Sequence, residues 1–344
     1  MRDRGFAVGE ALLAVAIALA VGALFVLIAD DSPATAYEAL WTSSVGSTNA
    51  LAQSMTTAIP IIVVGLGMGL AFRVGLFNLG GEGQMILGAL TTAVVGHALA
   101  SLPGAITFVL AVVSGCLAGA AWAVLPALWE VFLRVPLVVT TLLLNYVGAL
   151  LATYLAAYPL RDESGGSTLA QTAEIPSALQ LPIIVPNTPL HAGLFAAVLA
   201  PLGVLWLLQR TSLGYAMRMT GLNRDFAETG GVPMKRTIVT TMALSGALCG
   251  LAGALLVMGQ TYRYLDDSIV SPQTAWSGLA ASMLAGFHPL FTFVSGFFLA
   301  ALQTGGSGLQ LATNVPLQLV NVIQAVIIAM VAVRLWLGRR VLRR

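Results

Sequence analysis

The chain has 344 residues, of which 58% are hydrophobic and 9% are charged, and its mean hydropathy is +0.90. A water-soluble protein of this size needs far more charge to cover its surface, so this composition excludes a soluble globular domain. The net charge of +2 forms no basic patch, and nothing indicates nucleic acid as a partner. Long apolar runs containing Gly and Pro, without the alternation of a membrane barrel, predict an all-α, polytopic integral membrane protein surrounded by membrane lipid.

Taken in chain order, the apolar runs predict about ten membrane-spanning helices in a single transmembrane domain over residues 1–344. The predicted spans are 8–29, 51–71, 85–101, 105–127, 136–158, 191–208, 237–259, two short spans within 275–304, and 317–335. The first run is too long for the apolar region of an ordinary signal peptide and lacks a convincing cleavage site, so we expect it to be retained. The two short spans are divided by a predicted turn at His288 and Pro289.

The predicted spans place most basic residues on one side of the membrane. That side holds Arg2, Arg4, Arg73, Arg134, Arg210, Arg218, Arg224, Lys235, Arg236, Arg334, Arg339, Arg340, Arg343 and Arg344. The other side holds only Arg161 and Arg263, together with Asp30, Asp31, Glu38, Asp162, Glu163, Glu174, Asp266 and Asp267. Because cytoplasmic loops carry the excess of Lys and Arg, the first side is predicted to be cytosolic, as are both termini. The segments 30–50, 159–190, 260–274 and 305–316 are then external.

The loop 209–236 carries seven charged residues between two long apolar runs. Its sequence is typical of short helices, and such a segment between two spans is commonly offered to a partner in the aqueous phase. The alternative is a plain solvated connection, which is what charged residues between spans usually form. The order of Gly221, Asn223, Ala227 and Gly231, flanked by basic residues, favours the docking interpretation.

Residues 73–84 place four glycines beside Asn78, Glu82 and Gln84 at membrane depth or at its edge. Glycine permits an unwound backbone, whose freed polar groups are tolerated in a membrane only within protein or a water-filled cavity. Ionisable groups there are costly and usually functional. One interpretation is a broken helix that lines a solute path with these three side chains. The other is a structural turn in which they bond to the backbone.

Further polar residues lie within the predicted spans. The candidates for a solute path are Thr141, Asn145, Gln303, Asn321 and Gln324, with Thr140 beside them. Asn145 follows Thr141 by four residues, and Gln324 follows Asn321 by three, so each pair shares one helix face. Such groups suit a neutral, hydroxyl-rich or heterocyclic solute. Hydrogen bonding between helices is the alternative role of each.

No phosphate-binding Gly-x-x-x-x-Gly-Lys-Ser/Thr motif is present, and no Ser/His/Asp or Cys/His set lies at a common depth. We therefore expect neither an enzyme nor a cofactor or metal site. Cys116 and Cys249 lie in apolar runs and are interpreted as packing residues. The hexamers 114–119 and 245–250 are both Ser-Gly-x-x-x-Gly sequences, typical of close helix packing.

Four segments resemble the permease subunits of bacterial ATP-binding cassette (ABC) importers, in the family of branched-chain amino acid, simple-sugar and nucleoside permeases, and in its nucleoside-type branch. They are GLFNLGGEGQMILGAL (75–90), the loop part 221–236, LSGALCGLAGALL (244–256) and GFHPL (286–290). One departure is that Pro136 and Leu137 stand where nucleoside-type relatives often carry Asn-Glu, before the retained Thr140, Thr141 and Asn145.

The resemblance implies a type II-like ABC importer permease in the bacterial plasma (inner) membrane, with a cytosolic coupling helix. It implies ATPase subunits, a second permease subunit that forms a homodimer or heterodimer, and an extracytoplasmic substrate-binding protein or lipoprotein. It places ATPase coupling on Gly221, Asn223, Arg224, Ala227, Glu228 and Gly231. The separate ATPase would account for the absence of a nucleotide-binding motif in this chain.

The resemblance favours import of a nucleoside or a similar small polar solute. The same machinery serving simple sugars of the ribose or galactose type, or branched-chain amino acids, is the alternative. Amino acids rank lower, because no intramembrane Lys is available for a substrate carboxylate. An ion-coupled secondary carrier would need paired intramembrane charges, and a membrane enzyme would need a convergent catalytic set. The sequence shows neither.

Overall fold

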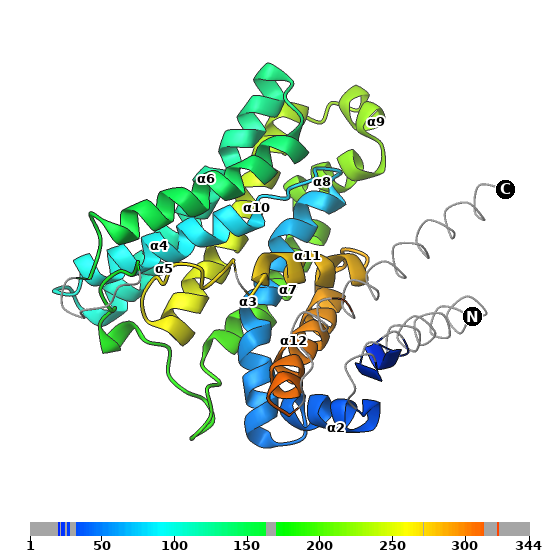
Figure 1. Cartoon of the computed structure of the whole chain (residues 1–344). Helices are drawn as coiled ribbons and strands as arrows, with labels where there is room; N and C mark the ends of the chain where they lie inside the picture. Colours follow the sequence, from blue (N-terminus) through cyan, green and yellow to red (C-terminus); the bar gives the residue numbers. More distant parts are fainter. Residues whose placement is uncertain are drawn as a thin grey trace. The chain divides into compact units, whose positions relative to one another are not determined.

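The computed structural model describes residues 20, 22–24, 26–27, 32–162, 170–270, 272–312 and 322. They fall into two compact units, one from residues 1–58 and 297–344 and one from residues 59–296. Each unit is treated separately below, and the prediction of one transmembrane domain over 1–344 stays a prediction. Every regular element in the described residues is a helix, and three isolated β-bridges supply the only strand-like pairing among them. The predicted all-α fold is confirmed (Figure 1).

The described helices are α2 (Pro33–Ser44), α3 (Thr48–Arg73), α4 (Gly81–Ala98), α5 (Gly104–Leu128), α6 (Leu137–Ala157), α7 (Gly193–Arg210), α8 (Ser212–Leu222), α9 (Arg224–Thr229), α10 (Met234–Leu256), α11 (Thr274–Leu284) and α12 (Pro289–Ala312). The π-helical turns η1 (Trp129–Leu133) and η3 (Val257–Thr261) extend α5 and α10, and η2 (Ser177–Leu179) is a 3₁₀ turn. Six of these helices, α3, α5, α6, α7, α10 and α12, are long and apolar enough to cross a membrane. The predicted spans 8–29 and 317–335 lie largely outside the described residues, so the count of ten stays a prediction.

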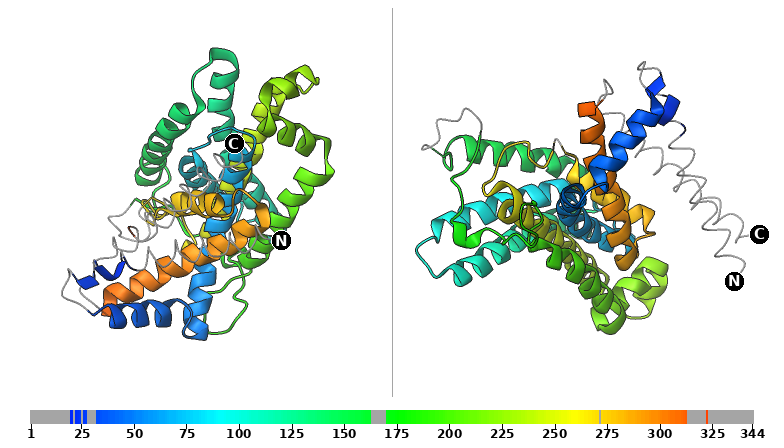
Figure 2. Two further views of the ribbon diagram at one scale, coloured as in Figure 1. Left: turned by 90° about the vertical axis from the view of Figure 1, so that its right-hand side faces the viewer. Right: turned by 90° about the horizontal axis from the view of Figure 1, so that it is seen from below.

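The centre of unit 59–296 is a close contact between α5 and α10, with α4 beside both (Figures 1 and 2). A Cβ atom added to Gly246 or Gly250 of α10 would collide with the carbonyl oxygen of Gly119 or Gly115 of α5. The two Ser-Gly-x-x-x-Gly hexamers therefore face each other. Without side chains at these positions the two backbones come close enough for extensive van der Waals contact, which drives helix association in lipid.

The helix α4 occupies the predicted span 85–101 but is not among the six helices that are long and apolar enough to cross a membrane. Glu82, Gln84 and His97 lower its hydropathy. It tolerates this composition because α5, α6 and α10 pack around it and most of its residues are buried. By contrast, α5 and α7 carry large exposed apolar side chains such as Val109, Leu117 and Leu199, as expected for helices that contact lipid.

The region 260–304 departs from its predicted form. The first of the two predicted short spans is α11, whose 11 residues extend only about 16 Å, against a hydrocarbon core of about 30 Å. Gly278 and Ser282 of α11 pack against Gly65 and Gly69 of α3, so α11 runs beside the second half of α3 and begins near its middle. The end of the segment 260–274, predicted as external, therefore lies at membrane depth.

Two segments of the other unit that were predicted to be external contain helix. The polar connection 30–50 contains the helix α2, whose first residue is Pro33. Proline is tolerated there because an N–H in the first turn of a helix has no intrahelical hydrogen-bond partner. The segment 305–316 was predicted to be external, and α12 continues into it as far as Ala312. Its glycines do not end the helix, because Gly305 and Gly308 lie against Leu40 and Ser43 of α2, where larger residues would collide.

Candidate functional site

The loop 209–236 folds into two short helices, α8 and α9, at the end of unit 59–296 where α3, α7 and α10 also carry basic residues. We call this the basic end. The Thr211 hydroxyl accepts from the Gly214 N–H (3.0 Å) and caps α8. The Asn223 side chain accepts from the Phe226 N–H (3.0 Å) and caps α9. Each capping oxygen satisfies a backbone N–H that the first turn of a helix leaves unpaired.

Both short helices are anchored in an apolar core. Met217 of α8 and Ala227 of α9 are fully or almost fully buried, in a cluster that also holds Leu70, Leu208 and Ile238. This cluster joins α8 and α9 to α3, α7 and α10. The pair of helices is therefore a rigid part of the unit rather than a loose connection.

Four of the six predicted coupling residues have structural roles in this arrangement, one of them being the cap Asn223. Gly221 lies so close to the Arg73 carbonyl oxygen that a Cβ atom would collide with it. Gly231 has φ +84°, a left-handed conformation that glycine adopts without strain and that ends the α9 turn. Ala227 is almost fully buried in the apolar core. The pattern Gly, Asn, Ala, Gly in this loop is thus explained by packing, capping and turn geometry.

The outer face of α8 and α9 carries both charge and exposed apolar surface. Arg224, Asp225 and Glu228 are exposed. Leu222 and Phe226, which sequence reasoning did not single out, are 81% and 64% exposed. Large apolar side chains displayed among charges on a rigid helix pair are typical of a docking site. Their spacing of four residues next to the predicted motif was the signal that could have identified them.

The contact between Gly221 and Arg73 connects this surface to the broken segment 74–80. The helix α3 ends at Arg73, Gly75 has φ +85°, and α4 begins at Gly81, which confirms the predicted break. The Arg73 guanidinium Nη1 donates to the Phe287 carbonyl (3.3 Å), in the turn between α11 and α12. A displacement of α8 would therefore act first on the end of α3 and on this break.

The broken segment is held by a buried amide cluster. Asn78 Nδ2 donates to Gln84 Oε1 (3.1 Å) and to Ser245 Oγ (2.9 Å), and its Oδ1 accepts from Gln84 Nε2 (3.0 Å) and the Gly80 N–H (2.9 Å). Ser245 Oγ in turn donates to the Gly67 carbonyl (2.7 Å). Asn78 and Gln84 are 0% and 1% exposed. The cluster ties the break to α3, α4 and α10.

The face of α6 that carries Thr141 and Asn145 completes this cluster. Thr141 Oγ1 accepts from the Leu79 N–H (3.2 Å), Asn145 Oδ1 accepts from the Gly83 N–H (2.9 Å), and Asn145 Nδ2 donates to the Leu79 carbonyl (2.8 Å). The backbone groups freed by the break are thereby satisfied by side chains. This conformation brings four predicted path residues together, and their side chains form hydrogen bonds with other protein groups. The four are Asn78, Gln84, Thr141 and Asn145.

Glu82 differs from these four residues because it is only half-buried. Its Oε2 accepts from the Trp276 indole Nε1 of α11 (2.8 Å), and Trp276 is 38% exposed. Trp276 was not among the residues predicted from sequence. Gln303 lies on α12 in the other unit, and Asn321 and Gln324 lie outside the described residues. The structure thus brings five of the eight predicted path residues to one region of unit 59–296.

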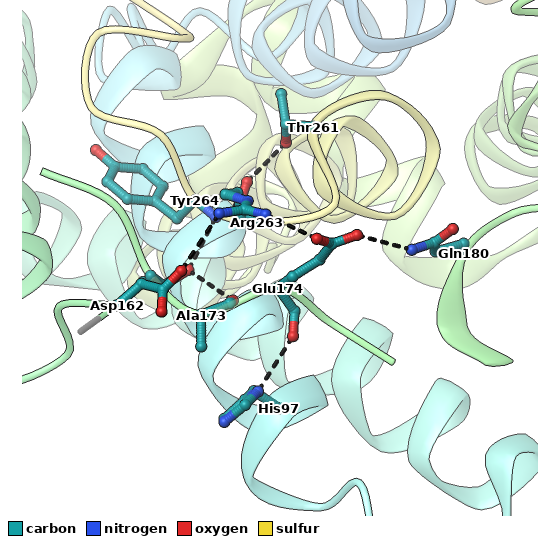
Figure 3. Close-up of polar contacts among 9 residues, drawn as sticks. His97, Asp162, Ala173, Glu174, Gln180, Thr261, Arg263 and Tyr264 are labelled. Atoms are coloured by element: carbon teal, nitrogen blue, oxygen red, sulfur yellow. Dashed lines mark hydrogen bonds and ion pairs between the residues drawn. The ribbon is translucent and has the colours of Figure 1, made fainter. Parts of the chain in front are cut away.

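At the opposite end of the unit, the described part of the loop 159–190 is clasped to the segment after α10 (Figure 3). The Arg263 guanidinium forms ion pairs with Asp162 (3.4 Å) and Glu174 (2.7 Å). Backbone bonds join Thr172 N–H to Tyr264 O (3.1 Å). Burial, and secondarily the charges of Asp266 and Asp267, raise the pKa of the Tyr264 hydroxyl, which therefore stays neutral. We call this contact the Arg263 clasp.

Comparison with known proteins assigns a family to this arrangement. Residues 50–332 match the family described as branched-chain amino acid transport system / permease component. The chain belongs to this permease family. The match includes the break, the α8–α9 pair and most spanning helices, and it makes the chain a multi-pass plasma-membrane permease subunit of an ABC transporter rather than an enzyme.

Several relatives of the permease are similar over almost its whole length. The guanosine ABC transporter permease protein NupP of Bacillus subtilis is 29% identical, over 93% of this chain and 92% of the relative. The nucleoside ABC transporter permease protein NupB of Lactococcus lactis is 28% identical, over 94% and 90%. The glucose ABC transporter permease protein TsgB13 of Haloferax volcanii is 30% identical, over 94% and 86%. No solved structure matches the permease.

Membership of this family implies ATPase and substrate-binding partners for the permease in general terms. The α8–α9 face combines exposed charge, exposed apolar side chains and a buried anchor. The identity of each coupling and path residue remains a prediction.

Proposed function

We propose that this permease moves a nucleoside, or a closely similar neutral polar solute, into the cell, driven by ATPase subunits that dock on the α8–α9 face. The observation that carries the solute class is the near full-length similarity to permeases named for guanosine and nucleosides. The similarity to a glucose permease supports a simple sugar as the second candidate. The partners are two ATPase subunits, a second permease subunit in a homodimer or heterodimer, and an extracytoplasmic binding protein or lipoprotein.

The proposed coupling route runs from Leu222 and Phe226 through Gly221 to Arg73 and the broken segment. Support comes from the buried anchor of α8 and α9 and from the contact of Gly221 with the end of α3. ATP-driven closure of the ATPase would push this rigid pair and thereby shift the break that joins α3 to α4. Arg224 and Glu228 would align the ATPase by charge.

The proposed orientation places the basic end and both termini in the cytosol. In the described residues, Arg73, Arg134, Arg210 and Lys235 lie at the basic end, and the far end carries the Arg263 clasp and its carboxylates. A membrane-impermeant maleimide on intact cells tests this placement. Ala178→Cys, exposed in the far loop, should be labelled, and Thr229→Cys of α9 should not. Labelling of Thr229→Cys alone would reverse the orientation.

The transport proposal is tested with the complete transporter reconstituted in proteoliposomes with its binding protein. Radiolabelled guanosine, glucose and leucine are offered in parallel, with ATP present or absent on the ATPase side. We expect ATP-dependent uptake of guanosine and no uptake of leucine. Glucose uptake without guanosine uptake would establish the second candidate and reject the first, and uptake without ATP would reject the ABC mechanism altogether.

A further inference from the structure

The pair formed by Glu82 and Trp276 lies near mid-membrane. The neighbouring cluster bonds to Ser245, about 17 Å along α10 from Met234, and to Asn145, about 12 Å along α6 from Leu137, at 1.5 Å per residue. Trp276 lies in the first turn of α11, beside the middle of α3. Both distances fall well inside a hydrocarbon core of about 30 Å.

At this depth the exposure of Glu82 requires an explanation. Its neighbours Asn78, Gln84 and Asn145 are buried and bonded to protein, whereas the Glu82 side chain is half-buried and reaches outward to Trp276. The Trp276 indole donates to Oε2 of Glu82, and the other carboxylate oxygen, Oε1, accepts no hydrogen bond from the described residues. Glu82 forms no ion pair within the described residues, so no cation neutralises it there. Lipid does not tolerate such a group, which must face water, solute or a partner subunit.

We infer that Glu82 and Trp276 form a solute-binding subsite in the transport path. This inference rests on the proposed function and narrows its substrate class. The carboxylate accepts hydrogen bonds from the hydroxyl or ring N–H groups of the solute. The indole ring, 38% exposed, offers a flat apolar face on which a heteroaromatic base or the apolar face of a sugar stacks. The bond from Nε1 to Glu82 holds both groups in one orientation.

The same pair selects against anionic solutes. A negative group brought close to Glu82 in a site of low dielectric is repelled, and the described residues supply no neighbouring cation to compensate. The subsite therefore accepts neutral solutes with hydrogen-bond donors, and it excludes anionic solutes such as nucleotides. Nucleosides and sugars are both neutral and carry hydrogen-bond donors, so both fit the subsite. Transport assays with a nucleoside and with a sugar distinguish the two solute classes.

The decisive measurement is a specificity ratio, since it does not depend on how much protein folds. The complete reconstituted transporter is assayed at pH 8 with inosine, which is neutral, and with xanthosine, which is anionic at that pH. The same binding protein is used throughout, so its own preference cancels between wild type and variant. Glu82→Gln keeps an oxygen that can accept from Trp276 and removes only the charge. We expect it to lower the inosine/xanthosine ratio of kcat/KM by about tenfold, because the repulsion is lost.

Trp276 is tested with Trp276→Leu, which removes the ring, and Trp276→Phe, which keeps a stacking face without the N–H. We expect KM to rise about tenfold for Leu and less for Phe, as removal of one stacked base contact does elsewhere. Trp206→Leu on α7, a Trp that is 62% exposed on a spanning helix away from this pair, is the matched control and should leave KM unchanged.

The outcomes separate this inference from the proposed function. An unchanged inosine/xanthosine ratio in Glu82→Gln, together with unchanged KM in Trp276→Leu, would overturn the subsite while wild-type nucleoside uptake stands. If the wild type imports glucose and no nucleoside, the proposed solute fails, and the glucose KM of the two Trp276 variants then decides the subsite. A rise confined to the Leu variant supports stacking, and no rise in either rejects it.

Discussion

At the scale of single residues, the loop 209–236 contains two kinds of position. Some residues hold the helices α8 and α9 in place, and others are exposed on the α8–α9 face. Gly221, Asn223, Ala227 and Gly231 allow close packing, cap a helix, fill the core and end a turn. Their residue types follow from the space and the backbone conformation available. The exposed side chains are what a partner could contact, and Phe226 is the largest apolar one on α9.

Gly221→Ala should destabilise the permease and impair uptake. The new methyl group would collide with the Arg73 carbonyl and push α8 away from α3, at a cost of about 1–3 kcal/mol. Gly203→Ala in α7 is the control, because a Cβ atom there meets nothing within 4 Å and alanine favours a helix. Thermal unfolding in detergent measures both. Equal stability of the two variants would show that the close contact does not matter.

Phe226→Ala should weaken ATPase binding roughly tenfold or more while the permease remains folded, because an exposed aromatic anchor is lost and no core contact changes. Phe195→Ala, a Phe that is 60% exposed at the opposite end of α7, should leave binding unchanged. Co-purification at graded ATPase concentrations measures the affinity. Equal losses in the two variants would contradict docking on α9.

His191 gives a pH-dependent prediction. It is buried before the start of α7, its Nδ1 accepts from the Gly193 N–H (3.2 Å), and burial lowers the pKa of its imidazole to about 4. The unfolded chain takes up this proton near pH 6.5, well before the folded one does. The neutral His191 imidazole therefore makes its full contribution to the free energy of unfolding above pH 6.5. That free energy falls by up to about 3 kcal/mol as the pH decreases towards 4.

His191→Asn retains an acceptor for Gly193 but cannot take up the proton. The fall in thermal stability between pH 7 and pH 4.5 should therefore be smaller in this variant than in the wild type. His97→Gln, which alters a histidine exposed near Glu174, should keep the wild-type dependence. An identical pH profile for all three proteins would exclude His191 as the source.

At the scale of elements, the break between α3 and α4 is stable because a neighbouring helix supplies the hydrogen bonds that the missing turns do not. Asn145 bonds to Leu79 O and Gly83 N from the face of α6. In this conformation the amide cluster thus takes the structural role that the sequence left open, and Glu82 is the member that faces outward. Conformational change at the break must exchange these bonds for others.

Asn145→Leu should destabilise the permease by about 2–4 kcal/mol, because it leaves one buried N–H and one buried carbonyl unpaired. A role in binding solute alone would instead raise KM and leave thermal stability unchanged. The pair of measurements, unfolding temperature and uptake KM, therefore distinguishes the two roles. Leu143→Ala, on the exposed face of α6, serves as the control for a substitution on the same helix.

At the scale of the whole molecule, the described part of the chain divides its chemistry between two ends of unit 59–296. The basic end carries the α8–α9 face, and the far end carries the Arg263 clasp, in which a cation holds two carboxylates from the loop 159–190. Between them lies the half-buried carboxylate Glu82. This distribution fits the proposed function, in which the ATPase docks at the basic end and the solute passes near Glu82.

Arg263→Gln should loosen the loop 159–190, because Asp162 and Glu174 lose their shared cation. Glu174 is 49% exposed, so water screens its share and we expect faster proteolysis of the loop rather than unfolding of the permease. Arg210→Gln, which removes an exposed Arg at the basic end, is the control. The effect is measured by digesting membranes with a protease that reaches the end carrying the Arg263 clasp. Equal digestion of both variants would contradict the role of Arg263 in holding the loop.

The sequence by itself determined the membrane class, the helical fold, most spanning segments, the break at 73–84 and the family. These rest on local properties, namely runs of apolar residues, helix-breaking glycines and short motifs, which need no knowledge of neighbours. The observed ends of α3, α5 and α10 differ from the predicted span ends by only a few residues.

Only the tertiary structure decided what depends on contacts distant in the sequence. The amides Asn78 and Asn145 are bonded to protein while Glu82 reaches Trp276, a partner 194 positions away. Leu222 and Phe226 are exposed while Ala227 is buried, and α11 ends as a half-length helix against Gly65 and Gly69. Burial and hydrogen-bond partners are properties of a packed surface, and a polar or apolar residue type does not reveal which neighbour will meet it.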